Sequence, residues 1–158
     1  LVDLAYKIFN QRDFPSFGWW LEHGATTTWE NWNGADSRNH PMFGGGIGWF
    51  YRDLAGLCVK DAGFRSFDIR PVVPEGLEWV DYTHNTTYGQ IAIRWEHRNG
   101  RFTLVCDVPV GTTATVWLPF SGATPSVKEN ANIIRKGERE GYALYKVRAG
   151  HYEFETAL

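Results

Sequence analysis

The sequence predicts a mixed fold, in which a helical N-terminal part is followed by an antiparallel β-sandwich. Apolar residues recur at three- and four-residue steps up to about position 59, which is the period of an amphipathic helix. From Phe64 onward the period changes to two, which is the period of strands. The change falls near residues 60–65, so we expect one domain at residues 1–62 and a second at residues 63–158.

Two helices are predicted in the N-terminal part. The first ends between Gln11 and Pro15, and its apolar positions are Leu1, Leu4, Ala5, Ile8 and Phe9. The second is expected over residues 47–59 with Gly63 as its stop, while residues 19–23 are either a further helix or an extended lead-in. Two or three helices cannot bury their own apolar faces. We therefore expect this part of the chain to complete a larger domain.

Alternating apolar and polar residues predict about seven strands in the C-terminal part. The two clearest cover residues 89–96 and 102–108, and the Asn99-Gly100 pair between them indicates a tight hairpin. Ile91, Ile93 and Trp95 share one face and are expected in the core. Further strands are predicted at residues 113–118, 133–135, 142–148 and 151–156, and this spacing is typical of an antiparallel sandwich.

Composition excludes several classes of function. With 43% hydrophobic and 22% charged residues, the 158-residue chain can build a packed core. A net charge of -2 disfavours a nucleic-acid partner, and no run approaches the roughly 18 apolar residues of a membrane span. The chain begins at Leu1 and not at Met, so we expect a piece of a longer protein, whose cellular location the sequence does not indicate.

Neither a metal nor another cofactor is predicted. Cys58 and Cys106 lack the spacing of a metal site or a disulfide framework, so buried free thiols are expected. The remaining candidate ligands, His23, His84, His97 and His151, are scattered without the close spacing of a zinc site.

Residues 24–46 are the best candidate for a functional site. This stretch holds Glu30, His40, Arg38 and two Trp residues in a segment too rich in Gly, Asn and Thr to be a plain core element. A mixture of polar groups and flat aromatic rings suits a hydroxylated ligand. We therefore expect a sugar site here.

The same residues resemble a known family. Gly24-Ala25-Thr26-Thr27, Trp29-Glu30 and Asn39-His40 resemble the C-terminal part of the catalytic region of bacterial α-L-rhamnosidases, inverting glycoside hydrolases of family 78. The likeness continues to about Phe120, through residues 49–56, Gly63-Phe64, residues 69–71, Tyr88-Gly89, Val108-Pro109, residues 112–116 and Leu118-Pro119. It implies the terminal helices of an (α/α)6 barrel at residues 1–62, followed by a C-terminal β-sandwich at residues 63–158.

The resemblance also implies roles for individual residues. Glu30 corresponds to the general base and His40 to a substrate-contacting histidine. Without the motif, Glu30 would be interpreted as a surface or helix-start carboxylate, and His40 as a loop residue that fixes backbone carbonyls. Trp32 either lies against the sugar or packs under the loop. No residue here matches the general acid, which is expected upstream of Leu1, so the fragment alone should be inactive.

The implied partners are a rhamnose-containing glycoside or polysaccharide and the remainder of the helical barrel. An alternative function is a non-catalytic carbohydrate-binding module that holds sugar through Trp79, Trp95 or Trp117. The alternation that places Trp95 in the core weakens this alternative. A third possibility is that the sandwich is only a stabilising scaffold for the barrel.

Overall fold

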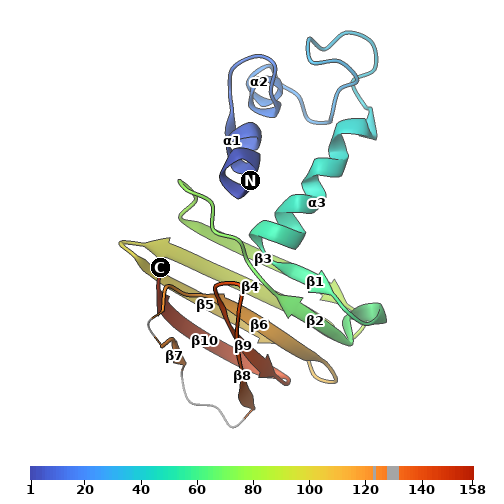
Figure 1. The fold of residues 1–158 in the computed structure, drawn as a ribbon. Coiled ribbons are helices and arrows are strands. Elements are labelled where there is room, and N and C mark those ends of the chain that lie inside the picture. Colours follow the sequence, from blue (N-terminus) through green and yellow to red (C-terminus); the bar gives the residue numbers. More distant parts are fainter. Residues whose placement is uncertain (123, 128–131) are drawn as a thin grey trace. The chain divides into compact units, whose positions relative to one another are not determined.

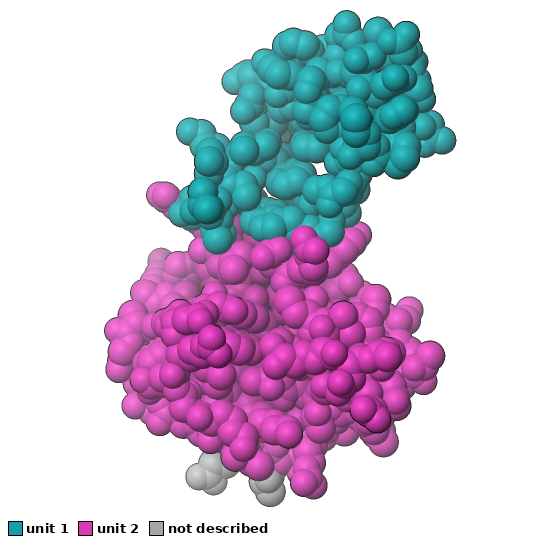
Figure 2. Space-filling model, turned by 45° about the vertical axis from the view of Figure 1, so that its right-hand side comes forward, with its two compact units in different colours: residues 1–50 teal, residues 51–158 magenta. Residues whose placement is uncertain are grey.

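The computed structural model describes residues 1–122, 124–127 and 132–158 (Figure 1). The chain divides into two compact units, unit 1 at Leu1–Phe50 and unit 2 at Tyr51–Leu158 (Figure 2). Each unit has its own set of packed side chains.

Unit 1 is helical, as predicted. Ser16 caps the second helix, since its hydroxyl accepts a 2.9 Å hydrogen bond from the backbone N–H of Trp19. Among the described residues, no helix is both long and apolar enough to cross a membrane. The helical elements of unit 1 are α1 (Val2–Asn10), α2 (Phe17–Glu22), η1 (Pro41–Gly46) and α3 (Ile47–Trp49).

Aromatic rings form the packed interior of unit 1. Trp20 is almost fully buried, and its ring lies 4.6 Å from that of Trp32 and 5.8 Å from that of Trp29, measured between centroids. Phe17 packs edge-on against Trp20 and stacks with Phe9 of α1. In contrast, α1 buries no residue completely. The small unit is therefore held together mainly by contacts between rings.

The prediction of one helix over residues 47–59 is wrong. Helical structure ends with η2 (Phe50–Leu54), and Leu57–Val59 forms strand β1. Gly56 makes the change possible: its φ is +80°, and a Cβ at this position would lie 2.3 Å from the backbone nitrogen of Pro71. Only glycine combines this backbone angle with so close an approach of the neighbouring chain.

The described residues of unit 2 form two five-stranded sheets, with strand orders β1-β2-β6-β9-β8 and β3-β4-β5-β10-β7. All neighbouring strands run antiparallel except β2 and β6, which are parallel. The antiparallel β domain that the sequence predicts is confirmed. The remaining bounds are η3 (Ala62–Phe64), β2 (Ser66–Ile69), β3 (Trp79–Thr86), β4 (Gly89–Arg98), β5 (Arg101–Val108), β6 (Thr113–Pro119), β7 (Ser126–Val127), β8 (Ile133–Arg139), β9 (Tyr142–Val147) and β10 (Gly150–Ala157).

The core of unit 2 is built from the apolar faces of these strands. Ile91, Ile93 and Trp95 are completely buried, as their alternation predicts. The Asn99-Gly100 hairpin is also confirmed, since both residues have positive φ and join β4 to β5. In β4, β5, β9 and β10, buried residues alternate with more exposed ones, so one face of each of these strands lies in the core.

Candidate functional site

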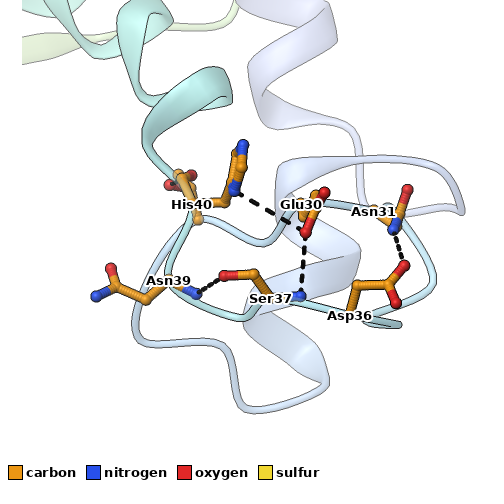
Figure 3. A network of polar contacts seen from close by, with 7 residues as sticks. Glu30, Asn31, Asp36, Ser37, Asn39 and His40 are labelled. Carbon is orange, nitrogen blue, oxygen red and sulfur yellow. Dashed lines mark hydrogen bonds and ion pairs between the residues drawn. The ribbon is translucent and has the colours of Figure 1, made fainter.

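The segment between α2 and η1 folds back on itself so that residues 27–30 lie beside residues 37–40 (Figure 3). The backbone N–H of Glu30 donates to the carbonyl of Ser37 at 2.8 Å, and the N–H of His40 donates to the carbonyl of Thr28 at 2.8 Å. The Thr28 hydroxyl adds a 2.5 Å hydrogen bond to the carbonyl of His40. These bonds bring Glu30 and His40 onto adjacent limbs of one loop.

The tip of the loop closes through its own polar groups. The Asn31 amide donates to the Asp36 carboxylate at 2.8 Å, and the Asn33 side chain accepts from the N–H of Ala35 at 3.1 Å. The backbone N–H of Gly34 donates to the carbonyl of Asn31 at 3.0 Å. Asparagine and aspartate commonly stabilise turns in this way, so the carboxylate of Asp36 is used for structure.

The loop is anchored on Trp29, which is buried. The guanidinium of Arg38 lies over the Trp29 ring at 4.8 Å and also donates through Nε to the carbonyl of Gly34 at 3.0 Å. Gly34 has a φ of +75°, and a Cβ added there would lie 2.7 Å from the same ring. The buried Trp29 ring therefore supports the loop, and its contact with position 34 leaves room for glycine alone.

The carboxylate of Glu30 is oriented by one backbone group and one side chain. Its Oε2 accepts a 3.2 Å hydrogen bond from the N–H of Ser37 and lies 3.9 Å from Nδ1 of His40 (Figure 3). Its Oε1 makes no hydrogen bond with the part of the chain that the structure describes. The side chain is 40% exposed. The carboxylate is thus held at Oε2, while the side chain as a whole remains partly accessible to solvent.

His40 holds the loop through its backbone and offers its ring to solvent. The backbone N–H and carbonyl both bond to Thr28, whereas the ring lies beside Glu30 and its side chain is 39% exposed. The alternative from the sequence, in which the ring fixes backbone carbonyls, finds no support in these contacts. The ring is placed where it can both donate to and accept from a ligand hydroxyl.

Trp32 packs within the aromatic interior. Its ring centroid lies 4.6 Å from that of Phe43 and 5.4 Å from that of Phe17, and its carbonyl accepts a 2.8 Å hydrogen bond from the indole N–H of Trp20. The residue is half-buried. Of the two interpretations of Trp32 from the sequence, these contacts favour packing under the loop.

An apolar hollow of about 380 Å³ lies on unit 1. Thr26, Thr27 and Thr28 of the loop form one side of it, and aromatic and aliphatic residues of the helices form the rest. Neither Glu30 nor His40 lines it. The candidate site is therefore the polar surface of the loop and not this hollow.

A further acidic residue of unit 1, Glu22, is engaged away from the loop. Glu22 forms a 3.0 Å ion pair with Arg12. Among the described residues, no three His, Cys, Asp or Glu side chains gather as a metal site would require. The N–H of Ser37 orients Glu30, and sequence reasoning could not single out this donor because a backbone N–H leaves no signature in the sequence. The hydroxyls of Thr27 and Thr28 bond to the carbonyls of Arg38 and His40 and not to Glu30.

Comparison with known families decides what this loop belongs to. Residues 1–54 match the six-hairpin glycosidase domain of bacterial α-L-rhamnosidases, and residues 56–132 match the C-terminal domain of the same enzymes. The chain belongs to the α-L-rhamnosidase family. The helices of unit 1 are accordingly the end of a six-hairpin domain, and the β domain after them is the family's C-terminal domain.

Individual α-L-rhamnosidases are similar over nearly the whole chain. The enzyme of Streptomyces avermitilis is 32% identical over 97% of this chain, and one from Formosa agariphila is 29% identical over 98%. The crystal structure of the S. avermitilis α-L-rhamnosidase complexed with L-rhamnose superposes with a TM-score of 0.86 at 31% identity, covering 97% of this chain. The α-L-rhamnosidase structure from Dictyoglumus thermophilum superposes with a TM-score of 0.85 at 37% identity, covering 99%. The chain spans only 16–19% of the length of these relatives.

Proposed function

We propose that the α-L-rhamnosidase to which this chain belongs removes terminal α-L-rhamnose from glycosides or polysaccharides with inversion, and that Glu30 is its general base. The supporting observation is the arrangement of the Glu30 carboxylate: Oε2 accepts a hydrogen bond from the N–H of Ser37, and the side chain is 40% exposed. A base needs a fixed orientation and access to water. The loop supplies both.

In this mechanism, water attacks the anomeric carbon from the face opposite the leaving group. Glu30 takes a proton from the water as the new C–O bond forms, and a second carboxyl group gives a proton to the glycosidic oxygen as that C–O bond breaks. The two carboxyl groups of inverting enzymes lie roughly 6.5–9.5 Å apart, which leaves space for the water. The product is released as the β-anomer of rhamnose.

The second carboxyl group comes, in this proposal, from the remainder of the six-hairpin domain. Within unit 1, Glu22 is paired with Arg12 and Asp36 is bonded to Asn31. Neither is available to protonate a leaving group without breaking those contacts. Residues 1–158 alone should therefore have negligible activity, and the remaining helices of the barrel are the partner that completes the site.

L-Rhamnose is the proposed sugar because the related S. avermitilis enzyme was crystallised with it. The His40 ring, beside the Glu30 carboxylate, is placed to bond to the sugar hydroxyls. Trp32 contributes by fixing the loop from within the aromatic interior and, at its exposed part, by contact with the sugar.

The decisive test is Glu30→Gln in the longer parent enzyme, assayed with p-nitrophenyl α-L-rhamnoside. Loss of a general base typically lowers the rate by about 10²–10⁴-fold, and we expect kcat to fall by this amount with nearly unchanged rhamnose affinity. Asp36→Asn is the matched control and should retain most of the activity. Near-normal turnover of Glu30→Gln would refute the assignment, and proton NMR of the first product shows whether the β-anomer is released.

His40→Ala in the same enzyme tests the binding role. We expect a higher KM and weaker rhamnose affinity with the fold intact, because the backbone bonds of His40 do not depend on its ring. Unchanged affinity would leave His40 with a structural role only. Assaying residues 1–158 alone completes the set, since substantial rhamnoside cleavage by the fragment contradicts a missing acid.

A further inference from the structure

We propose that unit 2 carries a second saccharide-binding site, centred on Trp79 on the outward face of the sheet β3-β4-β5-β10-β7. Its ligand is an uncharged, hydroxylated pyranose or a short chain of such rings. The site lies in the C-terminal β domain and stands whether or not Glu30 is the general base.

Trp79 is the one tryptophan of unit 2 whose ring is available to a ligand. Trp95 is completely buried and Trp117 is 9% exposed, whereas Trp79 is 54% exposed. Trp79 begins β3, which lies at the edge of its sheet. Leaving so large an apolar ring in water is unfavourable, and its flat face matches the apolar C–H face of a pyranose.

Strand register places polar groups beside this ring at defined spacing. Trp79 is directly opposite Glu96 of β4, and Asp81 is directly opposite Arg94. Because successive residues of a strand alternate between faces, these four side chains share the outward face. Opposite side chains in an antiparallel pair lie about 5 Å apart at Cβ, which is close to the width of a sugar ring.

The polar groups of the depression are paired with one another. Arg94 binds Glu96 at 2.7 Å and lies 3.9 Å from Asp81, while Arg98 lies 3.3 Å from Glu78. Interactions between such groups reduce the entropy that a ligand would lose in orienting them. Trp79, Asp81, Arg94, Glu96 and Arg98 together line a depression of about 280 Å³.

The charge of the depression favours a neutral ligand. Each carboxylate has a guanidinium partner, so neither sign dominates as it would in a phosphate or nucleic-acid site. Carboxylates accept hydrogen bonds and guanidinium groups donate them, and sugar hydroxyls do both. An exposed aromatic face beside such groups suits carbohydrate better than an ion or an apolar peptide.

The test is a titration of the ¹⁵N-labelled 158-residue chain with L-rhamnose and, separately, with a rhamnose-containing oligosaccharide, followed by NMR. Each tryptophan gives its own indole N–H signal, and Trp79→Ala assigns the one from Trp79. We expect this signal and the amides of Asp81 and Glu96 to shift saturably. Trp79→Ala and Glu96→Gln should each weaken the binding at least about tenfold.

Matched variants distinguish binding at the Trp79 site from binding at the loop of residues 24–40. Tyr88→Ala removes another exposed ring of unit 2, in the turn between β3 and β4, and should leave the affinity unchanged. Glu30→Gln should also leave the Trp79 signal responding. The proposal is overturned if only resonances of residues 24–40 shift, if no saturation occurs with either saccharide, or if glycerol causes the same shifts. None of these outcomes bears on the assignment of Glu30 as the general base, which the activity of Glu30→Gln tests separately.

Discussion

The indole N–H of Trp95 donates a 2.7 Å hydrogen bond to the backbone carbonyl of Leu54, which lies 41 positions earlier in the chain. Leu54 is the last residue of η2, where a helix leaves carbonyls without a helical partner. Trp95 is completely buried, so water cannot replace its contribution. A core side chain of β4 therefore provides the hydrogen bond that the last carbonyl of η2, just before β1, would otherwise lack.

Trp95→Phe should destabilise unit 2 by about 2–4 kcal/mol, because it leaves a buried carbonyl unsatisfied and also creates a cavity. Urea unfolding followed by circular dichroism measures the change. Trp79→Phe is the control, since that ring is exposed, and it should change the free energy of unfolding by no more than about 0.5 kcal/mol. Equal effects of the two substitutions would contradict the role given to the Trp95 hydrogen bond.

Gly34→Ala should disturb the candidate site without touching Glu30. The added methyl group meets the Trp29 ring at 2.7 Å, and alanine tolerates the φ of +75° poorly, so we expect a loss of about 1–3 kcal/mol. Amide hydrogen exchange at Glu30 and His40 should accelerate. Gly44→Ala is the control, because a Cβ there meets nothing within 4 Å. Unchanged exchange in Gly34→Ala would show that the loop relaxes freely.

His151 should make stability depend on pH. Its Nδ1 lies 2.7 Å from the Asp107 carboxylate and its Nε2 lies 3.6 Å from that of Glu153, and the hydrogen bond to Asp107 chiefly raises the pKa of His151. The folded chain thus holds the proton more tightly than the unfolded chain. This contribution is full below the unfolded value of about 6.5 and disappears as pH rises through the higher folded pKa.

The measurement for His151 is urea unfolding of the native chain and of His151→Gln between pH 5.5 and 8.5. We expect the native chain to exceed the variant most at the acidic end, with the difference shrinking toward the alkaline end. Because the ion pair is exposed, high salt should reduce the difference. A difference that grows with pH would have the wrong sign for this explanation.

The two thiols should differ in reactivity. Burial raises the pKa of Cys106 strongly, and the side chain is inaccessible in the core. Cys58 is only half-buried, which differs from the expectation of two buried thiols, and its pKa is raised first by desolvation and then by Asp53 and Asp68. Iodoacetamide at pH 8 should modify Cys58 slowly and Cys106 only after unfolding, as mass spectrometry of the intact chain would show. Faster labelling of Cys106 would place the native core in doubt.

Short sequence patterns predicted those features of the fold that are determined by neighbouring residues. Alternation identified the buried face of β4, and Asn99-Gly100 identified its hairpin, because both signals lie within a few residues. The end of the helix after Ile47 was not predictable in the same way. Leu54 and Cys58 keep helical spacing, whereas the strand that follows depends on Pro71 approaching Gly56 from elsewhere in the chain.

The candidate site shows the same division. Family likeness pointed to Glu30 and His40, and the structure brings them within 3.9 Å. The backbone donor that orients Glu30 depends on how the loop closes, and the packing of Trp32 depends on rings from both α2 and η1. Such relationships arise only in three dimensions, so residue types and spacing do not reveal them.

The parallel pairing of β2 with β6 has a consequence for synthesis on the ribosome. β2 leaves the exit tunnel well before β6, and β6 must in turn wait for β9. During that interval β2 can pair only with β1, and the core that buries Phe67 and Ile69 is incomplete. These two apolar side chains are therefore exposed in the nascent chain. Because β10 contributes Tyr152 and Phe154 to the core, the C-terminal domain can close only after translation has passed Ala157.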